Sequence, residues 1–175
     1  ENALKNLVQA NKISVNVQTG NVFQYLMAFS PNSKYIATAG SYDRIVKVWD
    51  LASGRTISSF TAHQLEINSV QYSPNGRYIV TSSEDSTIKV WNAFDFSLLY
   101  TIKRPKPELD VIFSPDSKFL VAGGRDSLIK FIGIHSGNVL KTLKKHRGAV
   151  TSLCFMPSDN DYLFSGGADS VVYKW

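Results

Sequence analysis

The sequence predicts an all-β protein assembled from repeated four-stranded units. Two observations support this fold class: proline and aspartate recur at a nearly constant interval, and short β-branched or aromatic runs alternate with turn-forming residues between them. No segment of useful length has the apolar spacing of an amphipathic helix. The apolar content of 43% is sufficient for a sizeable core, so we expect ordered structure.

Three positions in each unit define the repeat. Prolines recur at intervals of 43, 41 and 42 residues, at Pro31, Pro74, Pro115 and Pro157. Aspartates follow them at intervals of 42, 41 and 43 residues, at Asp43, Asp85, Asp126 and Asp169. Six residues after the aspartates come Trp49, Trp91, Ile132 and Trp175. Because this register is kept through four units, we interpret the chain as a tandem repeat.

Each unit has the size of one β-propeller blade. In the second unit we expect strands over residues 68–72, 78–82, 87–91 and 97–102. The segment Ser-Pro-Asn-Gly at 73–76 predicts a tight turn, because proline presets the second turn position and asparagine tolerates the next. A four-stranded unit of about 40 to 45 residues is typical of a propeller blade.

The recurring residues resemble those of the WD-repeat β-propeller family, over essentially the whole chain. The motifs are Val-Trp-Asp at 48–50, Val-Trp-Asn at 90–92, the aspartates in constant phase, and a histidine eleven residues before Pro74 and before Pro157. The resemblance implies a hydrogen-bonded tetrad of His, Ser or Thr, Asp and Trp. Two units contain all four residues: His63, Thr81, Asp85 and Trp91, and His146, Ser165, Asp169 and Trp175.

The other two units depart from this tetrad. The first has Gly20 and Ala39 beside Asp43 and Trp49. The third unit has three substitutions around Asp126, at Arg104, Ala122 and Ile132. We therefore expect packing, more than polar contacts, to hold these two blades.

We treat residues 1–175 as one WD-repeat propeller segment. Residues 1–19 supply the third and fourth strands of a preceding blade, over 3–8 and 12–17, and residues 20–62, 63–103 and 104–145 are whole blades. Residues 146–175 supply the first three strands of a further blade. An open arc leaves unpaired strand edges, so we expect these blades to be an open segment of a larger ring, of about seven blades as is common in the family.

A recurrent grouping of Ser or Thr, His and Asp raises the alternative of a hydrolase. A catalytic triad needs an exposed nucleophile and a base that reaches the substrate. Here the grouping recurs two repeats further along and includes a tryptophan, which favours a structural role. The sequence has no phosphate-binding glycine loop and no paired Cys or His at metal spacing. We therefore expect no catalysis, no cofactor and no metal.

The resemblance implies a rigid disc on which other proteins assemble. Partner contacts in the family often involve the loops that lead into the innermost strands and the positions before the turn aspartates. Those positions hold Phe23, Tyr25, Tyr42, Glu66, Asn68, Glu84, Pro107, Leu109, Arg125, Ala149, Thr151 and Ala168. Phe23, Tyr25 and Tyr42 would form an aromatic patch, although the first two also suit the start of an inner strand. Glu66 and Glu84 suit a basic peptide.

Charge and composition leave other partners open. Of the net charge of +5, much lies in the stretches 102–106 and 141–147. These stretches could attract nucleic acid, an acidic lipid surface or an acidic protein tail, or could simply form solvated outer edges. The single cysteine, Cys154, lies in an apolar run and is expected to be a buried, reduced thiol. No leader and no long apolar run are found, so we expect no membrane association and a cytoplasmic location, with the nucleus as the alternative.

The sequence therefore favours a non-catalytic scaffold or adaptor that presents a propeller face for assembly of a multiprotein complex. Two alternatives stay open. One is a propeller of an RNA-processing particle that binds nucleic acid through its basic outer strands. The other is a sensor or targeting propeller of a larger enzyme.

Overall fold

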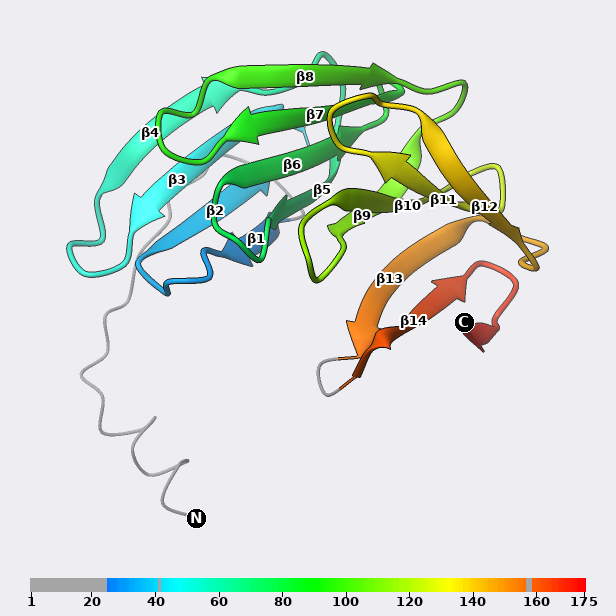
Figure 1. Cartoon of the computed structure of the whole chain (residues 1–175). Helices are drawn as coiled ribbons and strands as arrows, with labels where there is room; N and C mark the ends of the chain where they lie inside the picture. The colour runs from blue at the N-terminus through cyan, green and yellow to red at the C-terminus, as the bar shows by residue number, and fades with distance from the viewer. Residues whose placement is uncertain (1–24, 41, 157–158) are drawn as a thin grey trace.

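The computed structural model describes residues 25–40, 42–156 and 159–175, which form four antiparallel sheets (Figure 1). The first blade contains β1 (Tyr25–Phe29), β2 (Tyr35–Gly40), β3 (Ile45–Asp50) and β4 (Thr56–Thr61). The second contains β5 (Ile67–Tyr72), β6 (Tyr78–Ser83), β7 (Thr87–Asn92) and β8 (Leu98–Lys103). The third contains β9 (Glu108–Phe113), β10 (Phe119–Gly124), β11 (Leu128–Gly133) and β12 (Val139–Lys144). The fourth contains β13 (Val150–Met156), β14 (Asp159–Gly167) and β15 (Val172–Lys174).

Strands follow one another in chain order within every sheet, so each connection is a hairpin. The prediction of an all-β fold with four-stranded antiparallel blades is confirmed, and the expected strands of the second unit agree with β5–β8 to within one residue. None of the described residues forms a helix long and apolar enough to cross a membrane. The strands expected over 3–8 and 12–17 lie outside the described residues.

The turn between the first and second strands of a blade is held by its serine. In the second blade, the Ser73 hydroxyl accepts the backbone N–H of Tyr78 at 2.9 Å and contacts Asn75 Oδ1 at 2.8 Å. Ser30 and Ser114 make the equivalent bonds in the first and third blades. The Ser-Pro segments are thus local turn signals whose polar groups are satisfied within the turn.

The apolar cores lie between neighbouring blades. One cluster joins the first and second blades, a second joins the second and third, and a third joins the third and fourth. Their centres are β-branched residues of the third strands, such as Val46, Ile88 and Ile129, each 0 or 1% exposed. Burial of such side chains stabilises the fold by about 1.5 to 3 kcal/mol each. Each blade therefore depends on its neighbours.

One face of the fourth blade has no neighbour among the described residues. Val172 occupies the position of Ile88 and Ile129, yet it is 72% exposed. Cys154 also lies on this open face and is exposed. The expectation of a buried thiol is therefore wrong: Leu153 and Phe155 pack toward the third blade, and the alternation of the strand turns Cys154 the other way.

Candidate functional site

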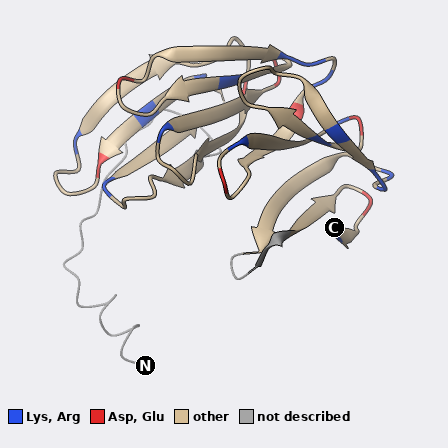
Figure 2. Cartoon of the chain, in the orientation of Figure 1, with Lys and Arg blue, Asp and Glu red and all other residues tan. Residues whose placement is uncertain are grey.

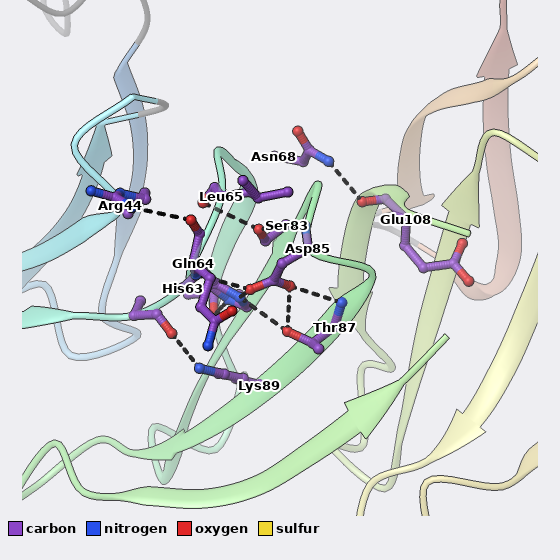
Figure 3. Close-up of polar contacts among 12 residues, drawn as sticks. Arg44, His63, Gln64, Leu65, Asn68, Ser83, Asp85, Thr87, Lys89 and Glu108 are labelled. Atoms are coloured by element: carbon purple, nitrogen blue, oxygen red, sulfur yellow. Dashed lines mark hydrogen bonds and ion pairs between the residues drawn. The ribbon is translucent and has the colours of Figure 1, made fainter. Parts of the chain in front are cut away.

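In the second blade, the four residues that match the family tetrad are joined by hydrogen bonds. His63 Nε2 lies 2.7 Å from Thr81 Oγ1, and His63 Nδ1 lies 3.0 Å from Asp85 Oδ2. Trp91 Nε1 donates to Thr81 Oγ1 at 3.0 Å. The Nδ1–H tautomer satisfies every group, because the hydroxyl then donates to Nε2 while accepting from the indole. Figure 3 shows His63 and Asp85 together with Gln64 and Thr87, whose backbone N–H groups also donate to the Asp85 carboxylate.

The fourth blade repeats this geometry. His146 Nε2 lies 2.8 Å from Ser165 Oγ, and His146 Nδ1 lies 2.9 Å from Asp169 Oδ1. Trp175 Nε1 donates to the same serine hydroxyl at 2.8 Å. Each of the two histidines therefore contacts the same kinds of partner in its own blade, a hydroxyl at Nε2 and an aspartate at Nδ1.

In the second blade, burial and neighbouring polar groups shift the pKa values of His63 and Asp85. Burial lowers the pKa of His63, against the opposing attraction of Asp85, so its neutral form is favoured. Burial alone would raise the pKa of Asp85, but hydrogen bonds from Thr87, the Gln64 backbone and His63 outweigh it and lower the pKa. Both nitrogens of His63 are already bonded and the residue is 2% exposed. This geometry leaves neither nitrogen available to a substrate.

The first blade retains part of the tetrad at a different residue from the one expected. Trp49 Nε1 donates to Thr38 Oγ1 at 3.0 Å, and Thr38 is opposite Lys47 just as Thr81 is opposite Lys89. The expectation that Ala39 fills the hydroxyl position of the tetrad is therefore wrong. Thr38 fills it, seven residues after Pro31, just as Thr81 lies seven residues after Pro74.

The third blade replaces the tetrad with a buried ionic cluster, which we call the Glu108 cluster: Arg104, Glu108, Asp126 and Lys130. Lys130 Nζ lies 2.7 Å from Glu108 Oε1 and 2.7 Å from Asp126 Oδ2, and Arg104 Nε lies 3.3 Å from Glu108 Oε1. Glu108 is 1% exposed. Gly124 makes room for this carboxylate, since a Cβ there would clash with Glu108 Oε2. The third blade therefore combines apolar packing with a buried ionic cluster that the sequence did not predict.

The turn aspartates have a second role that the sequence reasoning missed. In each blade, the carboxylate accepts the backbone N–H two residues further on, from Ile45, Thr87, Leu128 and Val171. The residue directly after the aspartate has a positive φ in all four blades, between 61° and 63°. The constant phase of the aspartates therefore reflects a turn that they cap themselves.

The described positions that were expected to contact partners are exposed or half-buried, and none of them is fully buried. Tyr42 is 59% exposed, and the Arg125 side chain is 55% exposed. Half-buried positions are Glu66, Asn68, Glu84, Pro107, Leu109 and Ala149, whereas Thr151 and Ala168 are exposed. Leu65, which the sequence reasoning did not single out, is 52% exposed beside them. Phe23 lies outside the described residues, and Tyr25 begins β1 with a side chain that is not described.

An ion pair links this face across two blades. Arg125 Nη2 lies 2.7 Å from Glu84 Oε1, and the same oxygen accepts from Asn68 Nδ2 at 3.2 Å. Asn68 also donates to the Glu108 backbone oxygen in the third blade, at 3.2 Å (Figure 3). Glu84 and Arg125, which the sequence treated as separate charges, therefore form one polar unit. We call Tyr42, Leu65, Glu66, Glu84 and Arg125 the loop face.

Among residues 25–40, 42–156 and 159–175, no three His, Cys, Asp or Glu side chains gather closely enough to hold a metal ion.

Comparison with known proteins places this architecture in a family. The family model "WD domain, G-beta repeat" matches residues 18–50, 54–92, 97–132 and 137–175. These segments cover most of the chain, which therefore belongs to the WD-repeat family of β-propeller proteins. The resemblance identified from the sequence is confirmed.

The chain is similar in sequence to proteins of several different functions. Histone acetyltransferase type B subunit 2 of Candida glabrata is 32% identical over 98% of this chain and 42% of its own length. Transcription initiation factor TFIID subunit 5 of Caenorhabditis elegans is 42% identical over 37% of this chain and 10% of its own length. Mitochondrial division protein 1 of Candida glabrata is 39% identical over 38% of this chain and 9% of its own length. The chain spans less than half the length of these relatives.

Proposed function

We propose that this chain is a non-catalytic scaffold whose loop face binds other proteins during assembly of a multiprotein complex. The observation that carries the proposal is a separation between two sets of residues. The groups that resemble a catalytic triad are buried and bonded to one another, whereas the residues that differ between blades are accessible on the loop face. Relatives named as subunits of a transcription factor and of a histone acetyltransferase support this role.

Tyr42 is the residue of the loop face best suited to anchor a partner. Its ring is 59% exposed, and a tyrosine offers a large contact area at small cost in side-chain entropy. Glu84 is already paired with Arg125, so Glu66 is the carboxylate of the loop face that is better placed to bind a basic peptide. A partner with an apolar anchor and a nearby cation fits this surface.

The test is affinity capture with wild-type chain and with Tyr42→Ala, followed by measurement of the affinity of the captured proteins. We expect Tyr42→Ala to weaken a loop-face partner by about 1 to 3 kcal/mol while leaving the melting temperature nearly unchanged. The exposed Phe94→Ala variant, in the β7–β8 turn, is the matched control. An unaltered set of partners in the Tyr42→Ala capture would contradict the proposal.

Binding of nucleic acid is the second candidate, and one observation favours it. Residues 127–158 contain no acidic residue, and Lys141, Lys144 and Lys145 are exposed along and after β12. Phosphate contacts would make the affinity fall steeply with salt, by about one counterion for each contact. Capture of partners at two salt concentrations distinguishes this function from the protein scaffold.

The proposed role includes a nuclear location. The cytoplasmic location expected from the sequence finds no support in the relatives' names, two of which concern transcription initiation and histone acetylation. A sensor or targeting role within a larger enzyme is a third candidate function, after the scaffold and the nucleic-acid propeller. It would be tested on the full-length protein by following the enzyme activity of Tyr42→Ala.

A further inference from the structure

We propose that the outer edge of the second blade is a second docking site, where an extended protein segment adds to β8 as a further antiparallel strand. The segment has acidic residues at its N-terminal end and alternating apolar residues after them. This site goes beyond the loop face, because it uses the rim of the blade and the free backbone of β8.

The backbone of β8 offers unpaired groups for such an addition. β8 is the last strand in the order β5-β6-β7-β8, so no described strand pairs with its outer side. Arg104 N–H donates to Ser86 O, and antiparallel ladder bonds alternate from there. Tyr100 and Ile102 therefore bond to β7, while the backbone groups of Thr101 and Lys103 point outward. Main-chain hydrogen bonds of this kind give strand addition its affinity.

The outer strands β8 and β12 differ in the charged side chains that would discourage strand addition. β12 carries the exposed lysines Lys141 and Lys144 within the strand, a feature that discourages strand addition. β8 has no charged residue from Leu98 to Ile102, and Leu98 and Leu99 are 46% and 39% exposed. The edge of β8 is therefore apolar and lacks charged side chains that would discourage strand addition.

A groove runs beside β8 on the side of the third blade. It has a volume of about 390 Å³ and is lined by residues 99–103 of β8 and residues 134–137 of the β11–β12 turn. The wall is braced by Tyr100, whose hydroxyl lies 3.2 Å from His135 Nδ1 and whose ring meets the imidazole edge-on. Side chains of an added strand that point toward the third blade would lie in this groove.

The two ends of β8 carry opposite charges, which fixes the direction of the partner. Asp95 precedes β8, and hydrogen bonds from Ser97 lower the pKa of its carboxyl group, so it is negative. Lys103 ends β8 and Lys106 follows, and both are exposed. Arg104 is not counted, because it is paired with Glu108. Figure 2 shows Lys and Arg at this end of β8 and in the loop after it.

An antiparallel strand begins beside Lys103 and ends beside Asp95. Its acidic residues must therefore come first. A protein segment fits better than nucleic acid, because the edge offers leucines and backbone groups, whereas Tyr100 is half-buried against His135 and does not present a free stacking face.

The test uses fluorescence anisotropy with the whole chain and a labelled peptide, Asp-Glu-Asp-Val-Thr-Val-Thr-Leu. The same residues in reverse order are the control peptide, and a twelve-nucleotide single-stranded RNA is the control for phosphate binding. Thr101→Pro removes an outward N–H, and Ser59→Pro is its matched control at the equivalent position of β4. Lys103→Glu reverses the charge without touching the ladder, with Lys34→Glu as its matched control on the first blade. Circular dichroism checks that each variant is folded.

We expect the peptide to bind wild-type chain at concentrations below about 1 mM, the range of a small transient interface. Thr101→Pro and Lys103→Glu should each weaken it at least about tenfold, whereas Ser59→Pro, Lys34→Glu and Tyr42→Ala should not change it. Equal binding of the reversed peptide, equal loss in Ser59→Pro, or binding of the RNA with no binding of the peptide would overturn the proposal. The Tyr42→Ala result separates this site from the loop face, since either site can fail without the other.

Discussion

Lys130 Nζ lies 2.7 Å from Glu108 Oε1 inside the third blade, where the second and fourth blades have a histidine bonded to an aspartate. Both side chains are buried, and two further charges, on Arg104 and Asp126, complete the cluster. The four formal charges cancel. A neutral set of four ions, two buried and two half-buried, therefore occupies the place of the His–Asp pair, in the one described blade that has Ile132 where the others have tryptophan.

Removing the central cation of the Glu108 cluster should destabilise the protein more than removing its counterpart in the second blade. Lys130→Met leaves Glu108 and Asp126 without their shared partner, and breaking a buried ion pair in this way costs about 3 to 5 kcal/mol. Lys89→Met is the matched control, because Lys89 donates only to the Ala62 backbone oxygen. It should cost about 1 kcal/mol. Urea unfolding measures both, and equal losses would contradict this role of the cluster.

The sequence predicts the fold well because the signals for it are local. Turn residues, β-branched runs and a constant register act within about 40 residues, and each specifies the same hairpins. The Glu108 cluster escapes such reasoning, because Glu108 and Lys130 belong to different strands and only the sheet brings them together. The Glu84–Arg125 pair escapes it too, since it joins two blades. The exposure of Cys154 cannot be predicted from its own apolar run, because it depends on what covers the open face of the fourth blade.

The hydroxyl groups of Thr38 and Thr81 should each stabilise the fold in proportion to the number of hydrogen bonds that they form. Thr38→Val removes one acceptor, for the indole of Trp49, and should cost about 1 to 2 kcal/mol. Thr81→Val removes the partner of both Trp91 and His63 and should cost more. Thermal or urea unfolding compares the two. If Thr38→Val were neutral, the first blade would depend on packing alone.

Replacing the indole itself should weaken a blade without acting on binding directly. Trp91→Phe removes the donor to Thr81 and part of the packing against Phe60, whose ring centre lies 4.6 Å away. We expect a loss of about 1 to 2 kcal/mol in the free energy of unfolding. Affinity for a loop-face partner, measured well below the melting temperature, should stay at the wild-type value. A weaker affinity in the fully folded variant would contradict a purely structural role.

The neutral state of His63 should make stability depend on pH. Burial lowers its pKa in the folded state below the ordinary value of 6.5, so the unfolded chain binds more protons between these two values. The stabilisation is fully present above pH 6.5 and is lost as the pH falls from 6.5 toward the folded pKa. The lowered pKa of Asp85 acts below 3.8, outside this window. Unfolding at several pH values should show a decline that His63→Gln reduces, and an unchanged slope would contradict it.

The larger ring expected from the sequence leads to a prediction about association. Met27 and Phe29 on β1 are 59% and 61% exposed, although Val111 and Phe113 at the corresponding positions of β9 are buried. Val172 on β15 is 72% exposed, although Ile88 and Ile129 at the corresponding positions of the other third strands are buried between blades. Such apolar faces favour contact with a further blade or with another copy of the chain. The 175-residue chain alone should therefore self-associate in analytical ultracentrifugation. Phe29→Asp with Val172→Asp should reduce this association, because charges on both faces oppose burial. A stable wild-type monomer at all concentrations would count against the larger ring.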